Sequence, residues 1–252
     1  SRGRVKLNII FILIKRELLK LNKNLFFYIL FMTLFPLVLY VIISIPLSLV
    51  VLDIKPVYDN WSASGIWVVT TLFSSYAFSF ISFKSFFNIE SFFLLPITPH
   101  KFLIFSYLYS LIIAFIQLSI SVLFIGTLNN DFMHFIHFML LLILFVPVVI
   151  LITNLAYITT QFIDNDIPLL IIHLLVFLTI SFNYGAFIPL KYFPDNYTRF
   201  VDFFPIPGLI NNAQKIISSE AVSFSLFLIS SFISVILSLL VFFNIEKKIT
   251  NK

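Results

Sequence analysis

Residues 25–51, LFFYILFMTLFPLVLYVIISIPLSLVV, form a run of 27 positions without a charged side chain. A helix needs about 20 apolar residues to cross the ~30 Å hydrocarbon core of a bilayer. Backbone groups in that core must find partners within the protein, and the run lacks the alternation of barrel strands, so we expect a helix. The run is longer than a vertical helix requires and carries Pro36 and Pro46, so we expect tilt, a proline kink or both to absorb the excess.

Five further apolar runs share this character. They are 63–83, 102–125, 136–160, 167–188 and 222–243. The composition agrees, with 60% hydrophobic and 11% charged residues. We therefore expect an all-α membrane protein with six transmembrane helices, built as a single transmembrane domain over residues 1–252. The absence of cysteine removes disulfides and thiolate catalysis from consideration.

The distribution of Lys and Arg predicts the orientation of these spans. An even number of crossings places both termini on one face, and cytoplasmic segments carry an excess of Lys and Arg. All but four of the 16 basic residues fall in the N-terminal region, the connection between the second and third spans, and the C-terminal region. The exceptions are Lys55, Lys191, Arg199 and Lys215. The sequence thus predicts cytoplasmic termini in a plasma membrane. Anionic membrane lipids account for the net positive charge without a nucleic-acid partner.

An amphipathic helix is expected over 5–22, before the first span. Its apolar side chains fall near one helical stripe: Ile9, Ile10, Leu13, Leu18 and Leu21. Its cations occupy much of the rest: Lys6, Lys15, Arg16 and Lys20. Such a helix lies in the membrane interface, with its stripe among acyl chains. A cytosolic extension of the first span is the alternative.

The second cytoplasmic connection, 84–101, reads KSFFNIESFFLLPITPHK and is strongly apolar although Lys84 and Lys101 bound it. Its side chains Phe86, Ile89, Phe93 and Leu94 can share one face of a short helix. Exposed apolar patches of this kind mark docking surfaces, so we expect a docking helix here. Burial against the protein's own N-terminal helix, or against the lipid surface, is the alternative.

The connection 189–221 joins helix-breaking residues to aromatic side chains on the outer face. Prolines stand at 189, 194, 205 and 207, and a glycine stands at 208. An ordinary extracellular loop would be more polar. The pattern favours short re-entrant or interface-lying helices, which are tolerated where protein covers their backbone.

Several kinds of chemistry lack their sequence signals. The five glycines are too far apart to write a phosphate-binding P-loop, so the chain does not bind ATP by that route. No catalytic arrangement or metal site is expected. His134 and His137 have ligand spacing, but we interpret them as ordinary outer-loop histidines. The spans hold no charged residue, which disfavours proton-coupled carriers and ion pumps.

Three segments, taken in order, resemble the type 2 family of ABC-exporter permeases. The first is IKREL at 14–18, and the second is IESFFLLPI at 89–97, which is similar to the coupling segment of that family. The third is GAFIPL at 185–190, followed by the Phe-Pro pairs at 193–194 and 204–205. The resemblance covers nearly the whole chain in topology, while each motif alone is degenerate.

The resemblance implies a homodimer or heterodimer of permease subunits, each resting on a separate ATP-binding cassette subunit that binds ATP and Mg. The chain itself would be no enzyme and would hold no cofactor. The cargo would be amphipathic or hydrophobic: a drug, a peptide or a lipid-linked molecule. A stand-alone carrier or channel, or an ATP-independent membrane immunity protein, is the alternative.

The resemblance also implies three groups of site residues. The coupling group consists of Phe86, Ile89, Glu90, Phe92, Phe93, Leu94, Leu95 and Pro96. The interfacial-helix group consists of Lys15, Arg16 and Glu17. The outer re-entrant group consists of Gly185, Phe187, Pro189, Pro194 and Pro205.

Overall fold

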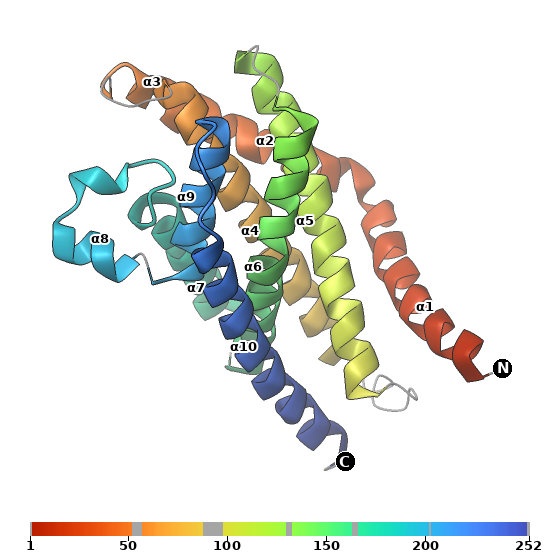
Figure 1. The fold of residues 1–252 in the computed structure, drawn as a ribbon. Helices are drawn as coiled ribbons and strands as arrows, with labels where there is room; N and C mark the ends of the chain where they lie inside the picture. Colours follow the sequence, from red (N-terminus) through yellow and green to blue (C-terminus); the bar gives the residue numbers. More distant parts are fainter. Residues whose placement is uncertain are drawn as a thin grey trace.

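A computed structural model describes residues 2–51, 57–87, 98–129, 133–162, 166–201 and 203–250. Throughout these ranges the regular structure is helical, with no strand. The N-terminal helix α1 (Arg2–Lys23) and the C-terminal helix α10 (Phe224–Thr250) both point their free ends toward the same end of the bundle (Figure 1).

Five helical stretches are long and apolar enough to cross a membrane. The first is Leu25–Ser48, which runs from the start of α2 (Leu25–Leu39) to the end of α3 (Ile45–Ser48). The other four lie in α4 (Tyr58–Phe87), α5 (Pro99–Asn129), α6 (Phe135–Phe162) and α10. They coincide with five of the six predicted spans. A sixth apolar helix, Ile171–Asn183, is shorter. The fold is therefore that expected of a multi-pass helical membrane protein.

Helix α4 is the central helix. Of its most apolar stretch, 83% is buried, against 22% for Leu25–Ser48 and 17% for α10. It packs on α5, α6 and α9 (Pro205–Ile217). Its buried hydroxyl side chains are Ser62, Ser64, Thr70, Thr71, Ser74, Ser75, Ser79 and Ser82. Small side chains let neighbouring helix backbones approach closely inside a membrane.

A buried amide network ties α4 to α2 and α5. Gln117 Nε2 donates to the Met32 carbonyl at 3.0 Å and to Ser121 Oγ at 3.1 Å, while Ser74 Oγ donates to Gln117 Oε1 at 3.1 Å. Gln117 is fully buried. The side chain thus uses both ends of its amide, as a polar group surrounded by apolar residues must.

The first span is interrupted by a π-helical turn, η1 (Tyr40–Ser44), between α2 and α3. The N–H of Ile45 donates to the carbonyl of Tyr40, five residues earlier. Pro46 follows directly, and a proline ring clashes with the carbonyl four residues before it in a regular helix. The wider turn relieves that clash beside Pro46, one of the two prolines from which a kink was predicted.

The helices extend beyond the uncharged runs that predicted them. Helix α4 begins at Tyr58 rather than Ala63 and continues through Lys84 to Phe87. Asp59 lies in its first turn and Lys84 in its last turn, where each charge complements the helix dipole. Residues 84–87 therefore belong to α4, and not to a separate connecting segment as predicted.

The fifth predicted span ends five residues early. Helix α7 (Asp166–Leu178) continues as a π-helical turn, η3 (Thr179–Asn183), and the chain then leaves the helical path. Gly185 has φ +84°, a backbone conformation that favours glycine, and no helix contains it.

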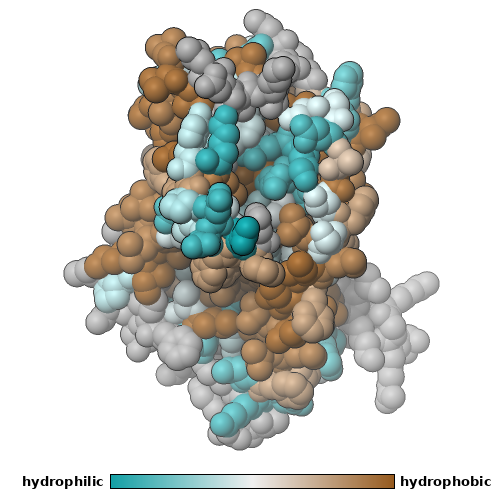
Figure 2. Space-filling model, turned by 60° about the vertical axis from the view of Figure 1, so that its left-hand side comes forward, coloured by the Kyte–Doolittle hydropathy of each residue, from teal (hydrophilic) through white to brown (hydrophobic). Residues whose placement is uncertain are grey.

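The chain then forms short helices before α10. These are η4 (Leu190–Tyr192), α8 (Asp195–Val201) and α9. Figure 1 shows α8 projecting to one side of the bundle, while α9 lies against α4, α6 and α10. Figure 2 shows apolar side chains over much of the face turned forward, with hydrophilic residues gathered in its upper half.

Candidate functional site

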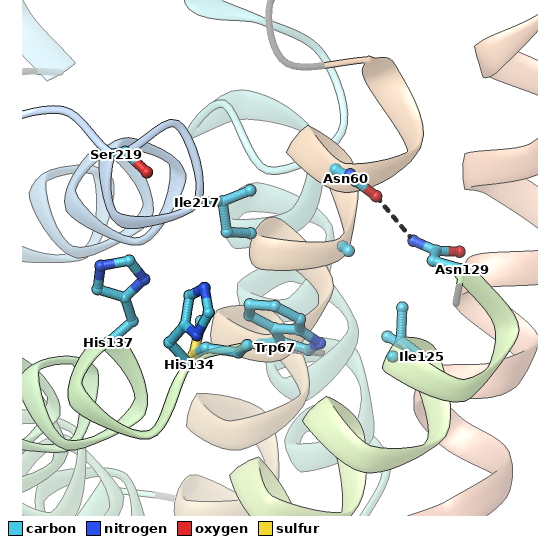
Figure 3. Close-up of a pocket in the computed structure, with 11 residues that line it drawn as sticks. Asn60, Trp67, Ile125, Asn129, His134, His137, Ile217 and Ser219 are labelled. Atoms are coloured by element: carbon cyan, nitrogen blue, oxygen red, sulfur yellow. Dashed lines mark hydrogen bonds between the residues drawn. The ribbon is translucent and has the colours of Figure 1, made fainter. Parts of the chain in front are cut away.

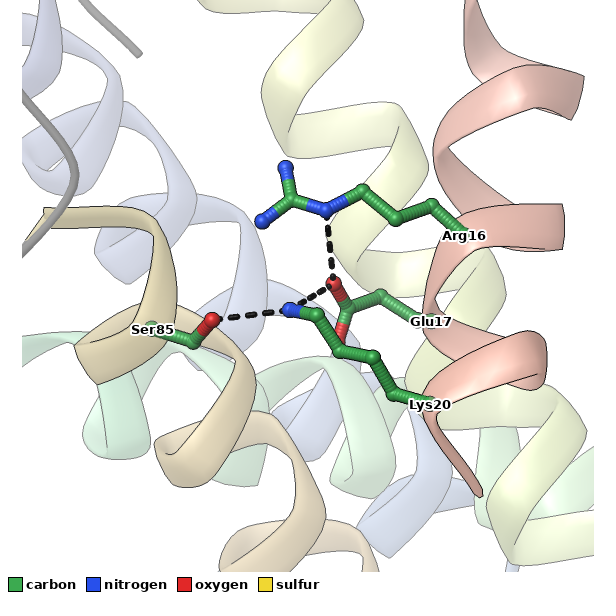
Figure 4. A network of polar contacts seen from close by, with 4 residues as sticks. All are labelled: Arg16, Glu17, Lys20 and Ser85. Carbon is green, nitrogen blue, oxygen red and sulfur yellow. Dashed lines mark hydrogen bonds and ion pairs between the residues drawn. The ribbon is translucent and has the colours of Figure 1, made fainter. Parts of the chain in front are cut away.

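A buried carboxylate joins α1 to the last turn of α4. The Glu17 side chain is 5% exposed, and its Oε1 accepts a hydrogen bond from Lys20 Nζ at 2.7 Å. Arg16 Nε lies 3.8 Å from the same oxygen. Lys20 Nζ also donates to Ser85 Oγ of α4 at 2.7 Å (Figure 4). We call Arg16, Glu17, Lys20, Ser85 and Phe86 the α1–α4 joint.

Phe86 forms the aromatic half of this joint. The guanidinium carbon of Arg16 lies 4.6 Å above its ring centroid, and Lys20 Nζ lies 5.5 Å away. The ring also meets Phe102 and Phe105 of α5 in edge contacts, with centroids 5.5 and 5.4 Å apart. Cations over an aromatic face are attracted by its quadrupole. One fully buried ring thus connects α1, α4 and α5.

The charges of the joint compensate each other locally. A carboxylate removed from water is costly unless it is paired and hydrogen-bonded. Glu17 has two cations within 4 Å of one oxygen, and those cations keep about a third of their side chains exposed (32% and 38%). The contacts with Ser85 and Phe86 fix α1 to α4. The joint carries one negative and two positive charges, so one positive charge remains in surplus there.

The joint corrects the predicted amphipathic pattern of α1. Leu13 is buried, and Ile9, Ile10, Ile14 and Leu21 pack against the core, but Leu18 is exposed. Glu17 takes the place of Leu18 in the inward stripe, because Ile10, Leu13, Ile14, Glu17 and Leu21 follow the three-and-four spacing of one helical face. Sequence reasoning missed Lys20 and Ser85 as partners. The available signal was a carboxylate on an apolar stripe with cations one and three residues away.

Of the eight predicted coupling residues, the structure describes only Phe86. Ile89, Glu90, Phe92, Phe93, Leu94, Leu95 and Pro96 lie outside the described residues. Phe86 is buried against α1 and α5, which agrees for this residue with the alternative of burial against the protein's own N-terminal helix. Its ring therefore holds the end of α4 in place, and its side chain presents no free surface.

The interfacial-helix group separates into two directions. Arg16 and Glu17 enter the joint. Lys15 instead lines a groove between α1, α2 and α5. Glu17 pairs with Arg16 and Lys20, and among the described residues no carboxylate pairs with Lys15.

Three of the five residues of the predicted outer re-entrant group lie together beside α4 and α9. The Tyr58 hydroxyl donates to the Phe187 carbonyl at 2.7 Å, and Gln214 Nε2 of α9 donates to the Gly185 carbonyl at 2.9 Å. Phe187 is fully buried. Gly185 and Pro189 line a cavity of about 290 Å³ with Trp61. The irregular segment 184–189 is thus held by side chains of α4 and α9.

The remaining two prolines have separate places. Pro205 is the first residue of α9, where its missing N–H costs nothing and its fixed φ suits the helix. It is buried. Pro194 is exposed and precedes α8. The structure therefore does not bring Pro194 into the cluster of Gly185, Phe187 and Pro189.

A second cavity, of about 180 Å³, holds both predicted loop histidines (Figure 3). His134 and His137 approach with ring centroids 5.8 Å apart, at the start of α6. Opposite them, Asn129 Nδ2 donates to Asn60 Oδ1 at 3.2 Å. Over the described ranges, no group of three His, Cys, Asp or Glu side chains comes together to hold a metal ion.

No protein-family model matches this chain, and a search of curated proteins found no match. The class that the fold defines is a helical membrane protein with several membrane-spanning helices. The α1–α4 joint gathers two ion pairs and a cation–π contact among the described residues.

Proposed function

We propose that this chain is the permease subunit of an ATP-driven ABC exporter in the plasma membrane. It works with a separate ATP-binding cassette subunit, which binds ATP and Mg, and with a second permease subunit. Its cargo is amphipathic or hydrophobic: a drug, a peptide or a lipid-linked molecule. The observation that carries the proposal is the α1–α4 joint, which lies directly before the segment that resembles a coupling helix.

The proposed topology has six spans and cytoplasmic termini. Helix α7 and η3 together cover Asp166–Asn183, 18 residues, which at 1.5 Å per residue is about 27 Å and close to a bilayer core. In this topology α8 and α9 lie on the outer side as re-entrant or interface-lying helices. The excess of Lys and Arg at the termini and between α4 and α5 supports this orientation.

The joint suggests how a partner's motion reaches the spans. A push on residues 88–97 acts on the end of α4 through the chain itself. From there the motion passes to α1, because Ser85 and Phe86 of α4 contact Lys20 and Arg16 of α1. Helix α1 leads into α2 after the single turn residue Asn24. The first two spans of one subunit therefore move together. The pathway opens when the first, second and fifth spans of the two copies part from each other.

The decisive test is reconstitution with the candidate ATP-binding subunit. We expect the pair to copurify and its ATPase activity to rise with cargo. Glu90→Lys, or Phe92→Ala with Phe93→Ala, should abolish cargo-stimulated ATPase activity while membrane insertion and dimerisation persist. Glu220→Gln, at an exposed outer position, is the matched control and should behave as wild type. Cargo transport by the purified chain alone, following an ion gradient, would establish a carrier or channel instead.

The joint has its own readout in this system. Glu17→Gln removes the charge that holds Lys20 and Arg16 in place, and the carboxylate–amide exchange preserves shape. We expect the variant to insert, to bind the ATP-binding subunit, and to hydrolyse ATP without the normal response to cargo. An unchanged response in Glu17→Gln would show that the joint is structural only.

A further inference from the structure

We propose that the groove between α1, α2 and α5 binds an anionic phospholipid of the leaflet nearest the chain termini. Its phosphate would lie at Lys15, and one acyl chain would extend along α2 and α5. This lipid is a bound structural ligand and not the exported cargo. The inference does not depend on the exporter function.

The groove has the composition of a lipid-chain site. Its volume is about 380 Å³, and aliphatic or thioether side chains form most of its wall. Leu18, Leu19, Leu21, Leu25, Ile29, Met32, Ile113, Ile116 and Ile120 contribute these groups. The other three lining residues are Lys15, Asn22 and Tyr28. An acyl chain binds well to such a wall, because it covers few polar side chains that would lose their hydrogen-bond partners.

The polar groups are placed to receive a headgroup. Helices α1 and α2 follow each other past α5 in Figure 1, so the order of residues in the sequence is their order along the groove. Lys15 is the first lining residue and Met32 the last on this wall. The cation therefore lies at one end, toward the chain termini, and the aliphatic wall continues away from it.

Charge complementarity identifies the occupant as anionic. Arg16 and Lys20 are held by Glu17 on the side facing α4. Lys15 lies on the groove side, and no described carboxylate forms an ion pair with it. A juxtamembrane cation attracts anionic lipids over zwitterionic ones. Next to Lys15 the groove is lined by aliphatic side chains of three helices. A phospholipid fits both the cation, through its phosphate, and the apolar wall, through its acyl chain.

Native mass spectrometry of the full chain tests the proposal. The protein is released from nanodiscs that contain equal amounts of palmitoyl-oleoyl phosphatidylglycerol and phosphatidylcholine. We expect one retained phosphatidylglycerol in excess over phosphatidylcholine, and we expect Lys15→Gln to lower that preference about fivefold, as loss of one basic contact implies. Lys23→Gln, which removes an exposed cation of α1 outside the groove, is the matched control.

A second pair of variants tests the apolar wall. Ile116→Trp fills the groove and should displace both lipids, whereas Leu123→Trp, at an exposed position of the same helix, should not. Should Ile116→Trp fail to give monodisperse protein, Ile120→Phe provides a milder filling. Equal retention of the two lipids by wild type, or a Lys23→Gln effect as large as that of Lys15→Gln, would overturn the assignment. Lipid retention unchanged in the groove-filled variant would overturn it as well.

Discussion

Gly65 of α4 lies directly against the backbone of Ala186, in the irregular segment after η3. A Cβ atom added to Gly65 would come within 2.2 Å of the Ala186 carbonyl oxygen. Ala186 is fully buried, and the Tyr58 hydroxyl holds the next carbonyl. The contact shows that α4 and the segment 184–189 are fitted to each other without room for a side chain.

Gly65→Ala is expected to destabilise the protein by about 3 kcal/mol, the upper end of the usual cost of overpacking. The Ala186 carbonyl oxygen belongs to the backbone and cannot rotate away from the added Cβ. Gly208→Ala is the graded comparison. There the nearest atoms are in the Leu226 side chain, at 3.1–3.2 Å, so a smaller loss is expected. Thermal unfolding in detergent measures both. Equal Tm values for the two variants would contradict the close contact at Gly65.

Gln117→Leu removes the amide that connects α2, α4 and α5. Side-chain hydrogen bonds within membrane proteins contribute about 0.6 kcal/mol on average and rarely more than 1.7. Three such bonds meet at Gln117, so we expect a loss of about 1–2 kcal/mol in unfolding experiments in detergent. Ser119→Ala, which removes an exposed hydroxyl of the same helix, should have little effect. A wild-type Tm in Gln117→Leu would refute the network's contribution.

The α1–α4 joint should respond asymmetrically to loss of its partners. Lys20→Met leaves the buried Glu17 carboxylate with Arg16 as its remaining cation, so we expect a loss of about 1–3 kcal/mol. Glu17→Gln should cost less, since the partly exposed cations can turn toward water. The double variant should cost less than the sum of the two, as coupled residues do. Chemical unfolding of the four proteins measures this coupling, and strict additivity would argue against the joint.

Ser219 ends α9 in a conformation that favours glycine. Its φ is +57°, and its N–H bonds to the Ile216 carbonyl while Glu220 N–H bonds to that of Lys215. This is the pattern of a Schellman motif, whose left-handed residue is usually glycine. Ser219→Gly should therefore stabilise the protein by about 0.5–1 kcal/mol. A lowered Tm would indicate that the serine side chain has a compensating contact.

Five of the six predicted apolar runs coincide with long helices, because length and hydropathy are properties of the local sequence, while the fifth run holds a shorter apolar helix, Ile171–Asn183. The runs did not predict where the helices end, since Asp59 and Lys84 are charged yet remain helical through the dipole. For the first span the sequence predicted tilt, a kink from Pro36 or Pro46, or both, and it did not predict the π-helical turn η1. Its π-helical form depends on which carbonyl Ile45 reaches, and residue type alone does not determine that choice.

The candidate site was predictable only in part. The segment at 14–18 was singled out through its resemblance, but the direction of Glu17 was not deduced. Leu18 and Glu17 are adjacent, so a shift of the helical stripe by one position exchanges their exposure. Ser85 lies 65 positions from Lys20 and accepts a hydrogen bond from Lys20 Nζ, which helps to fix the stripe with Glu17 facing inward. Such long-range partners leave no periodic signal in a single sequence.

The deep burial of α4 has a consequence for biogenesis. Its many hydroxyl side chains make it the least favourable of the long helices for partition into lipid as it leaves the translocon, where residence depends on apolar content. Helix α4 therefore gains its stable place once α5 and α6 have emerged to cover it. Nascent chains truncated after α4 should integrate poorly, and those extended through α6 should resist alkaline extraction.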